Sequence, residues 1–225
     1  MKYSIKLTQR RKDAKNVWWF TNRCFPLALL FFIFCFFSPF RAEAYLVRYK
    51  EQYYRLFHMH HQANPDNILE NLYWLERALE VPFANPLFAL AHIENEVEWE
   101  KYRYLFMMHV NIKMAEQHLF LGNHWNKRQA FFYNAPWKEQ NLEALETAEN
   151  AFRTALFYWE EALTWVEKLQ DRRLRWINLR RVQFWEDEAY RIMNGGLNYA
   201  RTIDRELVLL QAVRERFEAM DDTSY

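Results

Sequence analysis

The stretch WKEQNLEALETAENAFRTALFYWEEALTWVEKLQDRRLRWINLRRVQFWEDEAYRIMN, residues 137–194, contains neither glycine nor proline. It is rich in Ala, Leu, Glu and Arg, which have favourable helix propensities, and in aromatic residues. From residue 45 onward the chain has only three glycines and four prolines. A sheet protein needs more of both at its turns. The sequence therefore predicts an all-α fold of long packed helices.

The helix ends in this part of the chain are predicted from periodicity and capping residues. A break near Gln170-Asp171 would begin another helix, Asn194-Gly195-Gly196 is a C-terminal stop, and residues 197–220 form the last helix. Small and large apolar residues recur every three to four positions, as on one buried helix face. This stripe consists of Ala148, Phe152, Ala155, Trp159, Ala162 and Val166.

The preceding part of the chain carries further cap signals. Asp66 is the predicted N-cap of a helix that runs through the apolar positions Leu69, Leu72, Leu75 and Leu79. Asn85-Pro86 combines a capping residue with a proline at the first helical position. A long helix, continuous or interrupted, is therefore predicted from Pro86 toward a stop at Gly122-Asn123.

Two segments are similar to parts of a tetratricopeptide repeat. NLYWLERALEVPFANP (71–86) resembles its second helix and exit turn, with Leu75 and Ala78 in the expected places. Ala148, Phe152 and Ala155 form a second such pattern, but Ala78 and Ala155 are 77 residues apart, whereas a regular array repeats about every 34. We predict antiparallel helical hairpins in a degenerate tetratricopeptide-like repeat. A helical bundle with alanine-rich seams is the alternative.

Residues 1–44 have the three parts of a secretory signal. A lysine- and arginine-rich start precedes the apolar run CFPLALLFFIFCFF (24–37), and Ala42-Glu43-Ala44 is a cleavage site. A retained membrane anchor is the alternative, but the run is shorter than the about 20 residues that span a bilayer. We predict cleavage after Ala44, export to the periplasm, one helical domain at 45–220 and a frayed tail at 221–225. Membrane contact would require an uncleaved signal.

Composition disfavours several functions. Both cysteines lie in the predicted signal, so no thiolate remains for catalysis or zinc. After residue 44, 22 Lys and Arg face 27 Asp and Glu, and this net charge of −5 disfavours a nucleic-acid partner. Phosphate-loop motifs are lacking, and Ser224 is the only serine after residue 44. The sequence therefore predicts no catalytic residues, no cofactor and no small-molecule substrate.

The histidine-rich segment His58-Met59-His60-His61 is the one weak metal-binding candidate. On a helix, His58 and His61 share a face at a spacing that two imidazole ligands can use. The acids nearest in sequence, Glu51 and Asp66, are about two helical turns away. A metal-dependent enzyme that uses His58, His60 and His61 is therefore kept only as a minor alternative.

Aromatic residues are more abundant than a small helical core needs. Of 42 Phe, Trp and Tyr residues, 31 follow residue 44. Some are predicted to be surface anchors, although each ring has packing between helices as its alternative. The loop from Tyr133 to Trp137 is the best single surface candidate. The aromatic-rich binding candidates are Trp99, Tyr102, Tyr104, Tyr133, Pro136, Trp137, Trp185 and Tyr190.

A basic segment lies between the aromatic loop that ends at Trp137 and the candidates Trp185 and Tyr190. Arg172, Arg173, Arg175, Arg180 and Arg181 are interleaved with Trp176 and Trp185. If the segment is helical, cation–π contacts at i,i+4 from Arg172 and Arg181 explain the spacing. The alternative is a contact site for an acidic partner or anionic headgroups, with Arg172, Arg175 and Trp176 as candidate binding residues.

Four strings carry a more specific resemblance: WEKYRYLFMMHVN (99–111), KRQAFFYNAPWKEQNLE (127–143), FWEDEAYRI (184–192) and ALEVPFANPLFALA (78–91). Behind an export signal, they resemble a family of small periplasmic helical proteins of spirochaetes. That family is associated with tetratricopeptide-type collar proteins around the periplasmic flagellar motor. The resemblance implies a structural, non-catalytic role in motor assembly and motility, with collar or motor proteins as partners. A periplasmic adaptor or chaperone for envelope assembly is the alternative.

Overall fold

The computed structural model describes residues 46–221, apart from the side chains of Phe132 and Tyr133. The chain divides into two units, residues 1–46 and 47–225, and only the second is described below. The predicted signal peptide, its cleavage site after Ala44 and the last four residues of the predicted tail lie outside the described residues. Their interpretation stays a prediction.

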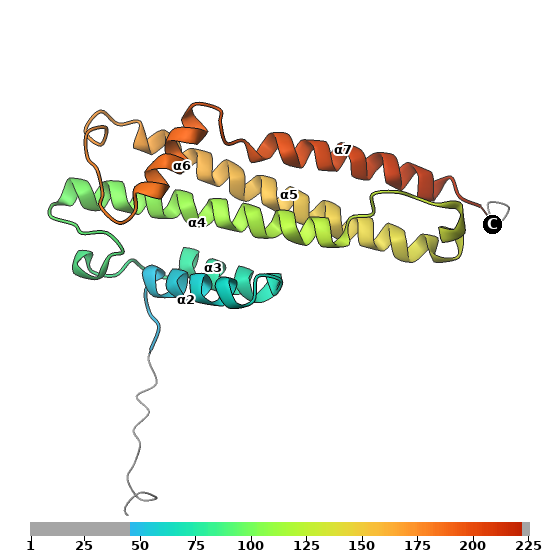
Figure 1. Ribbon diagram of the computed structural model, residues 1–225, viewed down its shortest axis with the longest axis horizontal. Helices are drawn as coiled ribbons and strands as arrows, with labels where there is room; N and C mark the ends of the chain where they lie inside the picture. The colour runs from blue at the N-terminus through green and yellow to red at the C-terminus, as the bar shows by residue number, and fades with distance from the viewer. Residues whose placement is uncertain (1–45, 222–225) are drawn as a thin grey trace, which may run out of the picture. The chain divides into compact units, whose positions relative to one another are not determined.

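Residues 46–221 are helical, and no strand occurs among them, so the prediction of an all-α fold is confirmed (Figure 1). The α-helices are α2 (Lys50–Ala63), α3 (Ile68–Glu80), α4 (Glu96–Trp125), α5 (Lys138–Leu169), α6 (Gln183–Met193) and α7 (Tyr199–Glu218). Two short 3₁₀ helices, η1 (Pro86–Phe88) and η2 (Phe132–Trp137), lie in the connections. None of these helices has the length and apolar composition that crossing a membrane requires.

Helices α4 and α5 form a long antiparallel hairpin at the centre of this unit (Figure 1). Their residue numbers run in opposite directions along the contact, because Tyr104 packs against Trp165 whereas His118 stacks on Tyr158. The six residues of the predicted apolar stripe of α5 are all buried, as expected. With 30 and 32 residues, α4 and α5 are too long for a repeat of about 34 residues per helix pair.

Gly122 does not end the long helix, so that prediction is wrong. Helix α4 continues to Trp125, and Gly122 is buried inside it. A Cβ atom at this position would lie 2.4 Å from Cε1 of Phe152 on α5. The glycine is therefore explained by the close approach of the two helices rather than by a turn.

Two helix starts also differ from the prediction, because neighbouring asparagines provide the caps. Asn67, not Asp66, caps α3 and accepts a hydrogen bond from the backbone of Glu70. Asn85-Pro86 opens only the three-residue helix η1. The long helix begins ten residues later, after Asn95, whose Oδ1 accepts from two backbone N–H groups of the first turn.

The hairpin of α2 and α3 packs on one side of α4, and α7 runs antiparallel along α5 (Figure 1). Lys50 at the start of α2 donates to the carbonyl oxygens of Ala78 and Leu79 at the end of α3. With 14 and 13 residues, α2 and α3 have the length of a tetratricopeptide hairpin. The fold is thus an all-α bundle of antiparallel hairpins, in which the tetratricopeptide character is clearest in α2 and α3.

Helix α5 ends at Leu169 with Gln170 as its C-cap, as predicted, but no helix begins there. Residues 171–182, named the arginine loop below, are turns and irregular backbone up to the start of α6. Helix α6 ends as predicted at Asn194, followed by Gly195 with a φ of 71°. The arginine loop and α6 together form the candidate site.

Candidate functional site

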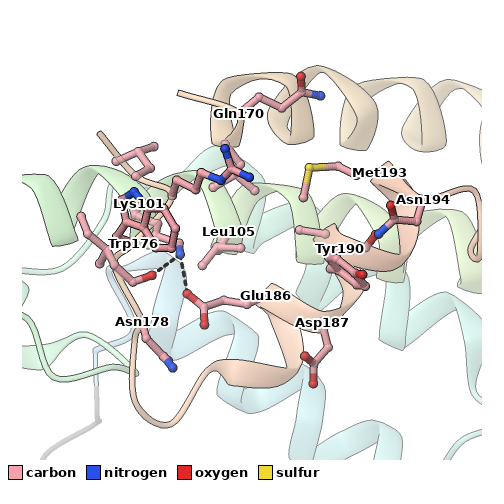
Figure 2. A pocket seen from close by; sticks show the side chains of 15 residues that line it. Lys101, Leu105, Gln170, Trp176, Asn178, Glu186, Asp187, Tyr190, Met193 and Asn194 are labelled. Carbon is pink, nitrogen blue, oxygen red and sulfur yellow. Dashed lines mark hydrogen bonds and ion pairs between the residues drawn. The ribbon is translucent and has the colours of Figure 1, made fainter. Parts of the chain in front are cut away.

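A pocket of about 800 Å³ lies between the first half of α4, the end of α5, the arginine loop and α6. Figure 2 shows Lys101 of α4 and Glu186 of α6 pointing toward each other, with Trp176 of the arginine loop on one side. Tyr190 and Met193 of α6 line the pocket on another side. The first half of α4 and the continuous segment from Leu169 to Asn194, which are distant from each other in sequence, thus contribute to one concave surface.

An ion pair joins the walls of this pocket. Nζ of Lys101 lies 2.6 Å from Oε1 of Glu186, and the two side chains are largely buried. The same ammonium group donates to the carbonyl oxygen of Ile177, and Glu186 also accepts from the backbone N–H of Leu179 at 3.4 Å. One lysine and one glutamate therefore connect α4, α6 and the arginine loop.

Apolar side chains anchor the arginine loop although it is not a helix. Leu174, Leu179 and Val182 are almost completely buried. Backbone hydrogen bonds close successive turns: the N–H of Leu174 donates to Asp171, that of Ile177 to Leu174, and that of Val182 to Leu179. The backbone of the loop is therefore anchored to the core, whereas its arginines and Trp176 are exposed.

Large side chains at the rim of the pocket are exposed. Trp176 is 86% exposed, Tyr190 is 66% exposed and Met193 is 48% exposed. The guanidinium group of Arg175 lies 5.5 Å from the ring centroid of Trp176, in cation–π range. Exposed rings of this size beside a cavity are typical of an interaction site.

The arginines of the loop fall into two groups. Arg173 pairs with Asp171 at 2.8 Å and with Glu100 of α4 at 3.5 Å, and its hydrogen bonds hold the pKa of Asp171 below the usual value. The others are exposed and form no ion pair with any residue in 46–221. They are Arg172, Arg175, Arg180 and Arg181.

A buried polar network lies on the opposite face of α6. Nδ1 of His109 donates to Oε2 of Glu188 at 2.5 Å, and Nε2 of His109 accepts from the hydroxyl of Tyr54 at 2.8 Å. Burial lowers the pKa of His109 and raises that of Tyr54. Because both rings are buried and the tyrosine stays protonated, this Tyr–His–Glu chain connects α2, α4 and α6 rather than presenting a nucleophile.

Three predicted surface residues are buried, so as surface anchors those predictions are wrong. Trp99 stacks on Tyr102 with ring centroids 5.3 Å apart, and Tyr102 lies 5.9 Å from Trp185. The hydroxyl of Tyr102 also accepts from the backbone N–H of Leu90. These rings form the core between α4 and α6 and have no surface to offer a partner.

The other predicted binding residues are distributed over the molecule. Tyr104 is half-buried against Trp165, and its hydroxyl donates to Glu100. Pro136 and Trp137 are exposed, but they precede α5, whereas the pocket lies at the end of α5. The side chain of Tyr133 lies outside the described residues. Arg172, Arg175, Trp176 and Tyr190 are all exposed on the arginine loop and α6.

Two imidazoles of the histidine-rich segment contact side chains of α3, and the third is exposed. His60 contacts Glu70 at 3.0 Å and Asn71 at 2.9 Å, His61 contacts Asn71, and His58 is exposed. Within residues 46–221 no three His, Cys, Asp or Glu side chains are grouped as metal ligands would be. The residues that contact His60 belong to α3. The residues next to His60 in the sequence did not indicate these contacts.

Sequence reasoning missed Lys101, Glu186 and Met193, the pocket residues that supply its ion pair and part of its apolar wall. No motif marks them, because they meet only through tertiary packing. Trp176 was predicted to stack on Arg172 at helical spacing. In the structure the segment is not helical and Arg175 takes that place.

The fold and the pocket define an all-α helical bundle with an exposed aromatic and basic site. Residues 97–220 match the family described as "Domain of unknown function (DUF8513)", and this chain belongs to that family. The matched segment includes all the residues that line the pocket and almost all of α4–α7, but neither α2 nor α3. No curated protein and no solved structure matches the chain.

Proposed function

We propose that this protein is a non-catalytic interaction scaffold that binds another protein through the pocket beside the arginine loop. The observation that carries the proposal is Trp176, 86% exposed on a loop whose neighbouring residues are anchored in the core. Such a ring loses little conformational freedom on binding and offers a large apolar area to a partner. Tyr190 and Met193 extend the same surface.

The ionisable groups of the molecule support binding rather than catalysis. Lys101 and Glu186 neutralise each other in the pocket wall. The Tyr54–His109–Glu188 chain is buried on the other face of α6, away from the pocket lining. A general acid or base must reach the atom it protonates, and neither set of groups is arranged to do so.

We further propose that the protein acts in the periplasm, with a component of the flagellar motor collar as its partner. This proposal rests on the signal predicted in residues 1–44 and on the resemblance to collar-associated proteins of spirochaetes. The tetratricopeptide-sized hairpin of α2 and α3 is compatible with such a role, because hairpins of this kind often build interaction surfaces.

Site-specific photo-crosslinking in intact cells tests both proposals. A photoreactive residue is placed at Trp176 or Tyr190, with Phe157 and Val208 as exposed control positions on α5 and α7. We expect one dominant partner in fixed proportion at the first two positions, and collar or motor proteins as its identity. Many unrelated envelope proteins would instead indicate an adaptor or chaperone. Crosslinks confined to the control positions would contradict the proposed site.

A further inference from the structure

The arginine loop is a positively charged segment in a chain whose net charge after residue 44 is negative. Residues 171–182 contain five arginines and one aspartate, whereas the chain after residue 44 has a net charge of −5. Arg173 is the only arginine of the loop with an ion pair among the described residues. Arg172, Arg175, Arg180 and Arg181 therefore present four positive charges to solvent.

The backbone that carries these charges is anchored to the core. The buried side chains of Leu174 and Leu179 alternate with exposed arginines, and Lys101 secures the backbone at Ile177. Arg181 has a φ of 78°, a left-handed conformation that is unusual for a residue other than glycine. Guanidinium groups carried close together on an anchored backbone favour carboxylates, which they bind in bidentate geometry.

The shape beside the charges favours a protein segment over a lipid surface. A pocket of about 800 Å³ adjoins the loop, and a flat layer of headgroups does not enter a concave site. Asn178 and Asn194 line the pocket and offer amide groups that suit a peptide backbone.

We infer that the pocket and the arginine loop together recognise an acidic segment of a partner protein, whose carboxylates pair with the exposed arginines while an apolar side chain enters beside Trp176. The inference rests on the proposed function and specifies its partner chemistry. Of the two partners considered for the basic segment, an acidic protein and anionic headgroups, the inference favours the acidic protein.

Selection from a random dodecapeptide library against the full-length protein tests this inference. We expect selected peptides to be net acidic with an aromatic or aliphatic residue, and to bind about tenfold more weakly to a variant with a neutralised loop. That variant is Arg172→Gln, Arg175→Gln, Arg180→Gln and Arg181→Asn, since asparagine tolerates left-handed backbone. The charge-matched control replaces Arg48, Arg55, Arg201 and Arg216, which are exposed elsewhere, by Gln and is expected to bind normally.

The outcomes separate this inference from the proposed function. Neutral peptides that lose binding in Trp176→Ala but not in the neutralised loop variant would overturn the acidic specificity and leave the binding site intact. Peptides that are insensitive to both changes would overturn the proposed site as well. Vesicles of about 3:1 phosphatidylcholine and phosphatidylglycerol provide the last comparison. Binding to them through the loop, with no selected acidic peptide, would assign the arginines to a membrane surface.

Discussion

The two faces of α6 differ in what their side chains contact. One face carries Trp185 and Glu188 into the core, where they meet aromatic rings and His109. The other carries Tyr190 and Met193 to the rim of the pocket, where they remain exposed. Within the 11 residues of α6, large side chains are thus buried in the core on one face and exposed on the other. The buried face sets the position of the helix, and the exposed face is free to bind.

The largest expected effect comes from removing the buried tryptophan. Trp185→Ala deletes a ring that contacts Tyr54, Phe106 and His109, so we expect a loss of about 3–5 kcal/mol in the free energy of unfolding. Chemical denaturation followed by circular dichroism measures it. Trp176→Ala, which removes an exposed ring of the arginine loop, is the matched control. Equal losses in the two variants would contradict the distinction between buried and exposed rings.

Neighbouring carboxylates on α6 provide a second comparison. Glu188→Ala leaves the buried Nδ1–H of His109 without its acceptor, and we expect a loss of about 1–3 kcal/mol in unfolding free energy. Asp187→Ala removes an exposed carboxylate one residue away and should change stability by less than about 0.5 kcal/mol. The same denaturation experiment measures the loss of unfolding free energy in both variants. A loss in Asp187→Ala as large as that in Glu188→Ala would refute the role assigned to the buried network.

The buried histidines predict a dependence of stability on pH. Burial lowers the pKa of His118 to about 4, so the unfolded chain binds a proton that the folded chain excludes. The contribution of His118 to stability should therefore be complete above the unfolded pKa of 6.5 and fall toward pH 4, by at most about 1.4 kcal/mol per pH unit. Urea denaturation at several pH values measures this slope.

A variant isolates the contribution of His118 to that slope. His118→Phe keeps a ring that can stack on Tyr158 but removes the titrating group, so its slope should be shallower than that of the wild type. Identical slopes in the wild type and the variant would assign the acid sensitivity to other groups.

The smallest effect on stability is expected at the rim of the pocket. Trp176→Ala and Tyr190→Ala should each change the free energy of unfolding by less than about 0.5 kcal/mol, because both side chains are exposed. Trp176→Ala with the photoreactive residue at Tyr190, and Tyr190→Ala with it at Trp176, should lose most of the partner crosslinking proposed above. Stable variants that retain full crosslinking would show that the rim of the pocket is not the binding surface.

Local chemistry was sufficient to predict the helical class and several helix ends. The buried stripe of α5, the C-cap at Gln170 and the stop at Asn194 follow from periodicity and capping, which act over a few residues. The prediction erred where two local signals competed. Asn67 and Asn95 capped helices in place of Asp66 and Asn85, and Gly122 was taken for a turn although it accommodates Phe152.

The candidate site depended on contacts between residues that are distant along the chain. Trp176 and Trp185 lie in equally aromatic and charged surroundings in the sequence, yet one is exposed and the other is buried. Composition established that aromatic residues are more abundant than a small core needs, and the sequence showed that arginines cluster in residues 172–181. Only the packing of α4, α5 and α6 decided which of them form the core and which surround the pocket, because burial is a property of the assembled helices.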